Sequence, residues 1–244
     1  MKMNSTMLGI LALAAMTVSC AKQTDGGSVA FRLDADLGVL EQTRSNVSDY
    51  TTLPSSGDFT IVITKSNGDE VYSGLLSAYD ETTPLKAGNY TVKASYGSTS
   101  EEGFDKPCFQ GQKEFSITGD NTTTVTIPVT LANSIIKVYC TDAFRAYFQD
   151  WSFVFTTGSG SKIEFHKNES RAAFVEAYKL SVAGTLTDQG GKIQTFGKAY
   201  DTTLSPKTCY TIKFDVSNVG SISTITITFD DTKENESVDI ELNS

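Results

Sequence analysis

The sequence predicts an all-β protein made of two tandem antiparallel β-sandwiches, of the immunoglobulin-like or transthyretin-like kind. Three observations lead to this fold class. Hydrophobic and polar residues alternate along many short runs, which buries one face of an antiparallel sheet and exposes the other to water. Turn-forming residues separate these runs, and the pattern restarts after Asn133. Each part is then about 100 residues long, a usual length for one sandwich.

The first 19 residues are expected to be a signal peptide rather than a part of the fold. Lys2 precedes an apolar run, residues 7–18, which is too short for a stable membrane-spanning helix. The run ends in Thr17-Val18-Ser19-Cys20, which resembles a bacterial lipobox. That resemblance implies attachment of diacylglycerol to the Cys20 thiol and cleavage before Cys20, so that this residue becomes the N-terminus. The covalent diacylglycerol and fatty acid on Cys20 then hold the protein on a bilayer. The alternative is an ordinary secretory leader in which Cys20 is coincidental.

Residues 20–27 are small and polar and are expected to tether the first sandwich, residues 28–132. Within that sandwich the alternation predicts strands around residues 29–33, 59–63, 90–94 and 124–131. Threonine occupies many of the polar positions, because its branched Cβ fits an extended backbone. Pro128 cannot donate a hydrogen bond to a neighbouring strand, so the last of these strands should lack a partner on one side.

The second sandwich is expected to cover residues 133–244. Alternation predicts its strands around residues 136–140, 151–155, 210–216, 225–229 and 238–242. Helical spacing is scarce, but Asp142 could cap a short helix that carries Phe144, Tyr147 and Phe148 on one face. Residues 169–178 fit either a second short helix or an irregular strand.

The composition argues against several classes of function. The formal net charge is −9 and no basic stripe is visible, so nucleic acid is not expected as a partner. No apolar run after the leader is long enough to cross a membrane. Once Cys20 carries lipid, the three remaining cysteines cannot all pair. Cys140 has the phase of a buried face and Cys209 that of a polar face, which favours buried thiols over a disulfide between them.

No catalytic or metal-binding residue is assigned from the sequence. His166 is the single histidine, without companions at the spacing of metal ligands, and no nucleophile motif is present. An exposed loop histidine is therefore favoured over a catalytic one. Tyr147 and Trp151 are candidates for stacking on sugar rings. Trp151 shares the phase of the buried residues on its strand, however, which favours packing in the core.

Arg44 is the candidate site for proteolytic processing. It precedes the polar segment 45–49 and follows the strand predicted around residues 29–33. A protease of tryptic specificity could cut an exposed arginine in such a loop. Loss of the upstream strand would expose a sheet edge, which a strand from a neighbouring subunit could then fill. The alternative is a solvated loop arginine.

Four stretches together resemble a known protein family: residues 84–92 (Pro-Leu-Lys-Ala-Gly-Asn-Tyr-Thr-Val), residues 104–111 (Phe-Asp-Lys-Pro-Cys-Phe-Gln-Gly), Asp142-Ala143-Phe144 and Glu169-Ser170-Arg171. The family consists of Bacteroidetes lipoproteins catalogued as a domain of unknown function, and the resemblance covers residues 28–242. It looks allied to the fimbrillin-like surface proteins, two-sandwich lipoproteins that assemble by strand exchange after cleavage at an arginine. The resemblance implies that Arg44 is the matching residue. These motifs are turns and core positions, so they indicate a family rather than an activity.

The sequence and this resemblance together predict a non-enzymatic lipoprotein of the bacterial outer membrane, exposed at the cell surface, that serves adhesion or a fimbria-associated role. Its expected partners are the outer membrane, through the lipid on Cys20, and other surface or fimbrial subunits or host or dietary glycans. No cofactor besides the covalent lipid is expected. The alternative is a carbohydrate-binding surface lipoprotein for nutrient capture, in which exposed aromatic rings bind sugars.

Overall fold

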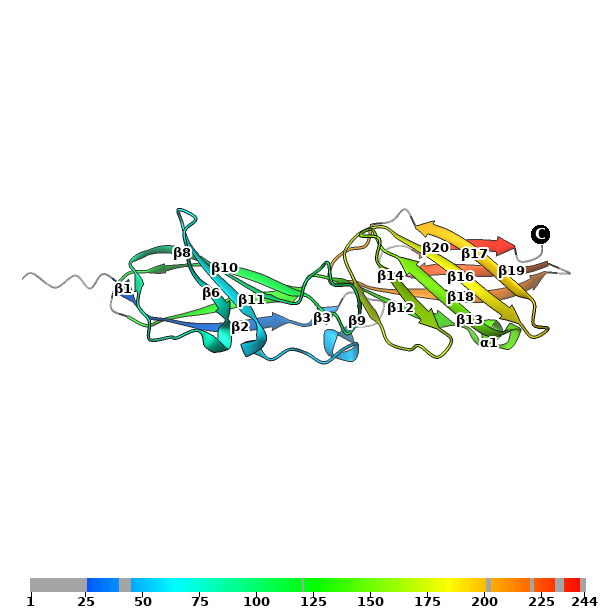
Figure 1. Ribbon diagram of the computed structural model, residues 1–244, viewed down its shortest axis with the longest axis horizontal. Coiled ribbons are helices and arrows are strands. Elements are labelled where there is room, and N and C mark those ends of the chain that lie inside the picture. Colours follow the sequence, from blue (N-terminus) through cyan, green and yellow to red (C-terminus); the bar gives the residue numbers. More distant parts are fainter. Residues whose placement is uncertain are drawn as a thin grey trace, which may run out of the picture.

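A computed structural model describes residues 26–39, 45–119, 121–200, 203–219, 222–230 and 235–241 of the chain. Most of these residues lie in β-strands, and the predicted all-β sandwich class is confirmed. The strands form two bodies that lie end to end, with β2, β8 and β10 in the first body and β12, β13 and β18 in the second (Figure 1). Within the described part of the chain, no helix is both long enough and apolar enough to cross a membrane.

The main sheet of the first body contains six strands in the spatial order β2-β11-β10-β8-β5-β6. These strands are β2 (Val29–Asp36), β5 (Thr60–Lys65), β6 (Glu70–Leu75), β8 (Gly88–Tyr96), β10 (Phe109–Ile117) and β11 (Thr123–Leu131). Two short pairs flank the sheet: β1 (Gly26–Gly27) with β7 (Leu85–Lys86), and β3 (Gly38–Val39) with β4 (Ser45–Asn46). Three single-turn 3-10 helices lie in the connections: η1 (Val47–Asp49), η2 (Ser56–Asp58) and η3 (Leu76–Ala78).

The six-stranded sheet closes into a sandwich because β10 and β11 separate along most of their length. They pair from Leu131 to Val129 on the β11 side, and the pairing stops before Pro128, which has no amide hydrogen to donate. A side chain at Gly111 of β10 would collide with the Pro128 carbonyl. The predicted lack of a partner on one side of this strand is confirmed for its first part. Phe31 of β2 then meets Phe115 of β10 edge to face, with ring centroids 5.6 Å apart, across the core.

The second body contains two facing sheets, with the strand orders β20-β19-β18-β12-β15-β9 and β14-β13-β16-β17. Their strands are β9 (Gly103–Phe104), β12 (Ser134–Cys140), β13 (Phe148–Thr156), β14 (Lys162–His166), β15 (Ala173–Val175), β16 (Leu180–Asp188), β17 (Ile193–Tyr200), β18 (Cys209–Val219), β19 (Ile222–Asp230) and β20 (Asn235–Glu241). The rings of Phe153 and Phe214 stack between the two sheets, with centroids 3.8 Å apart and planes 9° from parallel.

Most pairs of the described strands are antiparallel, as expected, but one pair in each body is parallel. β2 runs parallel to β11 in the first body, and β12 runs parallel to β18 in the second. Parallel neighbours need a long connection between them. The local alternation of side chains does not reveal such pairs, because it is the same in both orientations.

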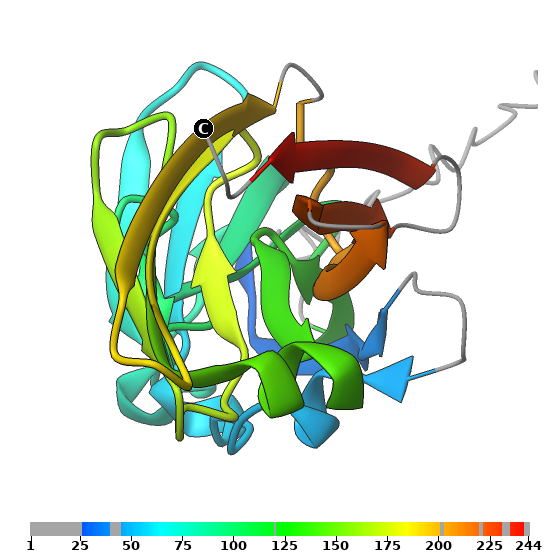
Figure 2. The same ribbon diagram turned by 90° about the vertical axis from the view of Figure 1, so that its right-hand side faces the viewer.

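Helix α1 (Asp142–Tyr147) lies across the end of the second body that faces away from the first (Figures 1 and 2). The predicted short helix is confirmed, but its N-cap is Thr141 and not Asp142. The Thr141 hydroxyl oxygen accepts a hydrogen bond from the Phe144 amide at 3.1 Å and donates one to Asp215 Oδ1 at 2.7 Å. Phe144 is fully buried, so the helix closes this end of the core.

The cysteines Cys108, Cys140 and Cys209 are buried thiols. Burial raises the pKa of Cys140 to about 12, so this thiol stays protonated at neutral pH. The predicted polar-face position of Cys209 is wrong, because the side chain is only 2% exposed. It belongs to the core cluster of the first body, which covers that end of β18.

Residues 169–178 contain the short strand β15, so the strand alternative is confirmed there.

Candidate functional site

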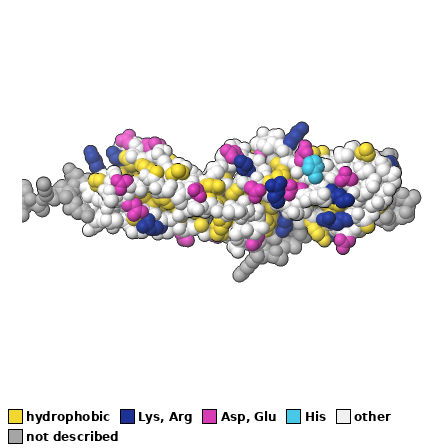
Figure 3. All heavy atoms as spheres, turned by 60° about the horizontal axis from the view of Figure 1, so that its bottom comes forward, with side chains coloured by type: hydrophobic (Ala, Val, Ile, Leu, Met, Phe, Trp, Pro, Cys, Tyr) yellow, Lys and Arg dark blue, Asp and Glu magenta, His cyan; other side chains and the backbone are white. Residues whose placement is uncertain are grey.

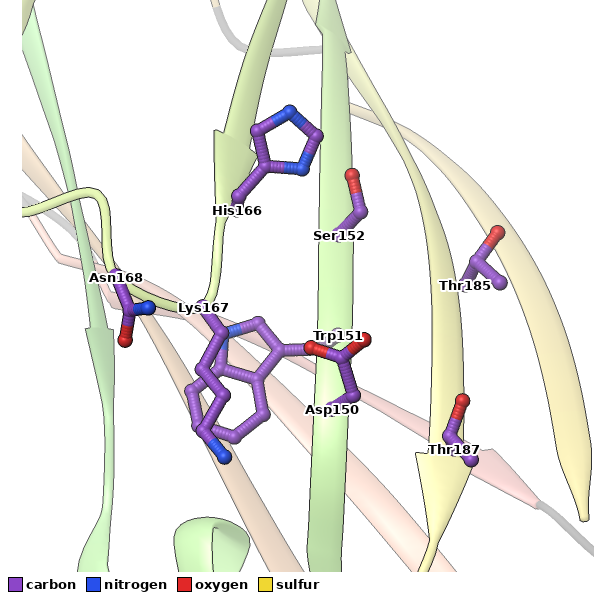
Figure 4. A pocket seen from close by; sticks show the side chains of 8 residues that line it. All are labelled: Asp150, Trp151, Ser152, His166, Lys167, Asn168, Thr185 and Thr187. Atoms are coloured by element: carbon purple, nitrogen blue, oxygen red, sulfur yellow. The ribbon is translucent and has the colours of Figure 1, made fainter. Parts of the chain in front are cut away.

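A polar hollow of about 250 Å³ lies on the outer face of the four-stranded sheet, and its lining includes Trp151 and His166, which were both considered from the sequence. Three strands and the turn after β14 supply its lining, drawn as sticks in Figure 4: Asp150, Trp151, Ser152, His166, Lys167, Asn168, Thr185 and Thr187.

Strand register brings the polar residues of the hollow together. Ser152 of β13 lies opposite His166 of β14 on one side and opposite Thr185 of β16 on the other. Side chains alternate between the faces of a strand, and the flanking residues Trp151 and Phe153 are buried. The row formed by Ser152, His166 and Thr185 therefore projects away from the core.

A β-bulge supplies the second row of the hollow. The pairing of β13 with β16 shifts between Phe148 and Asp150, which brings Asp150 opposite Thr187. An extra residue of this kind changes the direction in which the following side chains point. The Asp150 carboxylate and the Thr187 hydroxyl therefore lie beside the first row rather than in line with the buried positions.

The turn after β14 carries Asn168 and is held by an ion pair. The Glu169 amide donates to the His166 carbonyl at 2.8 Å. The Glu169 carboxylate accepts hydrogen bonds from Arg171 Nε at 3.0 Å, from Nη2 at 2.8 Å and from the Arg171 amide at 2.9 Å. These contacts with Arg171 outweigh burial and lower the pKa of Glu169 to about 2. The pair thereby keeps the turn in the conformation that presents Asn168 to the hollow.

Trp151 packs in the core and closes the base of the hollow. It is 5% exposed, and its ring meets Phe144 edge to face at 5.4 Å. Lys167 Nζ lies 5.4 Å from the centre of the indole and donates to the Gln149 carbonyl at 2.5 Å. The guanidinium carbon of Arg145 lies 5.8 Å from the same ring. This environment fits the prediction that Trp151 packs in the core, and it leaves the indole ring little surface for a sugar.

The other residues singled out from the sequence lie elsewhere. Tyr147 belongs to α1, is half-buried, and meets Phe148 edge to face at 4.8 Å, so it does not line the hollow. Cys20 and Arg44 lie outside the described residues. Arg44 belongs to the segment that connects β3 with β4.

His166 is exposed, as expected, but it ends strand β14 instead of lying in a loop. Its side chain is 67% exposed, and its Nε2 atom lies 3.3 Å from Glu164 Oε2. Figure 3 shows this single histidine on the surface, among scattered acidic and basic side chains. Among the contacts of the described residues, none joins Ser152 Oγ to the imidazole.

The hollow can bind a ligand rich in hydroxyl groups. Its three hydroxyls and the Asn168 amide both donate and accept hydrogen bonds, and the Asp150 carboxylate accepts them. No group of three histidine, cysteine or acidic side chains that could hold a metal ion occurs within the described ranges.

Sequence reasoning considered Trp151 and His166 but missed the other polar residues around them. Ser152, Thr185 and Thr187 are visible in the sequence as outward positions of alternating strands. Their proximity depends on the register between β13 and β16 and on the bulge, which a single strand does not encode. Asp150 stands next to Trp151, but the bulge that directs it into the hollow has no glycine or proline as a signal.

Comparison with known proteins identifies a family and a loose structural likeness. The model of the family described as "domain of unknown function (DUF4493)" matches residues 25–244. No curated protein matches the chain. A candidate cell adhesion protein of Bacteroides fragilis is 10% identical, with a TM-score of 0.45 over 86% of this chain and 99% of that one. A candidate polysaccharide-binding protein of Bacteroides thetaiotaomicron is 13% identical, with a TM-score of 0.43 over 82% and 95%. These likenesses are too loose to carry an argument about function.

The ion pair behind Asn168 predicts a loss of stability in acid. The pKa of Glu169 is lowered in the folded protein, so its contribution is complete above the unfolded pKa of about 4.5 and disappears as the pH falls toward about 2. Arg171 is half-exposed and solvent screens the pair, so we expect a contribution of at most about 1 kcal/mol. Urea unfolding of the native protein and of Glu169→Gln should differ at pH 7 and converge at pH 2. A difference that stays constant across this range would contradict the assignment.

Proposed function

Because the chain belongs to the family described as a domain of unknown function (DUF4493), we propose its role from its own architecture: a non-enzymatic adhesion protein of the bacterial cell surface. The end-to-end arrangement of the two bodies is the observation that carries this proposal (Figure 1). The described chain begins in the first body, whereas α1 and the polar hollow belong to the second. Anchoring through the N-terminus would hold the first body near the membrane and present the second to the surroundings.

Lipid attachment at Cys20 would place the first body directly at the bilayer. Gly26 begins β1, six residues after Cys20, and an extended chain of that length reaches about 20 Å. Burial of acyl chains is favourable by about 0.8 kcal/mol per methylene, so an anchor with several chains holds the protein almost permanently. We infer an outer-membrane lipoprotein on these grounds.

Cys20→Ala should abolish lipid attachment. In cells grown with a clickable palmitate analogue, the native protein should carry the label and stay in the membrane fraction, whereas the variant should be unlabelled and leave that fraction. Cys108→Ala is the matched control, since this thiol is buried inside the first body and should leave labelling unchanged. An unlabelled native protein would rule out the anchor.

A fimbria-associated role would use cleavage at Arg44. β2 is an edge strand, paired only with β11, and its inward residues Val29 and Phe31 are 0% and 2% exposed. A cut at Arg44 would separate the segment that carries β1, β2 and β3 from β4 and the strands that follow it. Strand β2 could then be replaced, because an uncovered edge and core favour pairing with a strand from another subunit.

Processing at Arg44 predicts a new N-terminus at Ser45 in surface-derived protein. Edman or mass-spectrometric analysis should find this terminus in the native protein and lose it in Arg44→Gln. Arg32→Gln is the control. Arg32 lies in β2 and is paired with Glu81 at 2.7 Å, so it is outside the β3–β4 connection in which the cut would occur. A chain that retains residues 20–44 in assembled material would contradict this route.

Carbohydrate binding is the second candidate function, and the hollow on the second body favours it. Polar groups line this hollow beside a buried indole, and an open site of this kind suits the hydroxyls of a sugar. Stacking on the candidate rings of Tyr147 and Trp151 would be secondary here, since Trp151 is buried. Hydrogen bonds from Asp150 and Asn168 would determine the orientation of the sugar instead.

Asp150→Asn and Asn168→Ala should each weaken glycan binding by about 10-fold, the effect expected from one lost polar contact with the ligand. A glycan array of host and plant polysaccharides would identify the bound glycan. Titration with that glycan would then give the ratio of the dissociation constants of each variant and the native protein. Thr156→Ala is the control, because Thr156 lies on the same strand outside the hollow. Equal binding by all variants, or no bound glycan, would remove this candidate.

A further inference from the structure

A strap from the first body extends into the second. We use the word strap for residues 97–107, which connect β8 with β10 of the first body. Strand β9 lies in the middle of the strap, yet it pairs antiparallel with β15 at the edge of the six-stranded sheet of the second body. The strap leaves one body, adds a strand to the other and returns.

The carboxylate of Glu102 attaches the strap by three hydrogen bonds. It accepts from the Thr157 hydroxyl at 2.7 Å, from the Ser159 hydroxyl at 2.5 Å and from the Glu176 amide at 2.8 Å. All three donors belong to the second body. Burial raises the pKa of Glu102, but these hydrogen bonds outweigh it and hold the pKa below its usual value. The carboxylate is therefore charged at neutral pH, where its hydrogen bonds are strongest.

Phe104 and Asp105 attach the next part of the strap. The Phe104 ring meets Phe165 of the second core edge to face, with centroids 5.1 Å apart. Arg171 covers the other side of the Phe104 ring, with its guanidinium carbon 4.4 Å from the ring centre. The same guanidinium donates to Asp105 Oδ2 at 3.3 Å. Apolar packing and charge thus act on adjacent residues of the strap.

The two cores also share residues at the junction. Strands β12, β15 and β18 lie at this junction. In each of them, two consecutive residues have side chains that point into different cores. Ile135, Phe174 and Cys209 join the core cluster of the first body. The residues that follow them, Ile136, Val175 and Tyr210, join the core cluster of the second. The first core is therefore completed by side chains that the second body supplies.

We propose that the strap acts as a latch and that, with the shared core residues, it makes the two bodies one rigid unit that unfolds cooperatively. Tandem domains usually move relative to each other unless their interface is large and apolar. Here a strand pair, the partly buried ring of Phe104, three hydrogen bonds to one carboxylate and the shared core oppose such motion. The orientation of the hollow relative to the first body is then constant.

Hydrogen exchange on the full mature chain tests the latch. In the native protein, amides in residues 102–104 and 173–176 should exchange at least about 100-fold more slowly than an exposed loop. Glu102→Ala should speed exchange in these segments by about 10-fold. The matched control is Glu101→Ala, since Glu101 is paired at 3.4 Å only with Lys106 inside the strap. Fast exchange in the native protein, or no effect of Glu102→Ala, would overturn the proposal.

Cooperative unfolding provides a second measurement that does not depend on a variant. Trp151 is the single tryptophan, so its fluorescence reports the second body alone, whereas far-ultraviolet circular dichroism reports the strands of both bodies. The two urea curves should have the same midpoint in the native protein. Midpoints that differ would show that the bodies unfold separately and would refute a single rigid unit.

Discussion

The arrangement of the two bodies depends on a buried asparagine at the point where the chain passes from one to the other. Asn133 lies between β11 and β12 and is fully buried. Its side-chain oxygen accepts a hydrogen bond from the Cys108 amide, beside β10, and its carbonyl accepts one from the Lys207 amide at 2.8 Å, beside β18. These two contacts connect Asn133 to residues beside a strand of each body, and they pair two buried oxygens that would otherwise cost free energy.

The sequence predicted the strands well because the physics that forms them is local. Alternation along Val125, Ile127 and Val129 is enough to place a strand with one buried face, and the structure has β11 there. The proline in that strand also indicated correctly that one side of the strand lacks a partner along part of its length. The same rule gave the wrong burial for Cys209. Alternation places this side chain on the outward face of β18, but the first body covers that face at the start of the strand. Alternation within one strand does not reveal that another body covers it.

Features that depend on pairing between distant segments could not be predicted in this way. The parallel pairs β2–β11 and β12–β18 join residues about 90 and 70 positions apart, and a strand has the same pattern in either orientation. The strap contains Glu102 and Phe104 in a polar stretch that resembles an ordinary loop between strands. Only the position of β15 and of the β13–β14 turn shows what these side chains bind. The hollow also depends on pairing between distant segments, since three strands contribute residues to it.

The outward positions of these strands are the part of the molecule in which binding can change without changing the fold. Phe153 stacks against Phe214 and occupies space that no other side chain fills, so its replacement would leave a cavity. Ser152, its neighbour in sequence, points to solvent and supports no packing. A substitution at such an exposed position usually changes stability by less than about 0.5 kcal/mol. In the proposed binding role, ligand preference would therefore be determined by residues that the core does not constrain, and the rigid junction would determine only the direction in which those residues face.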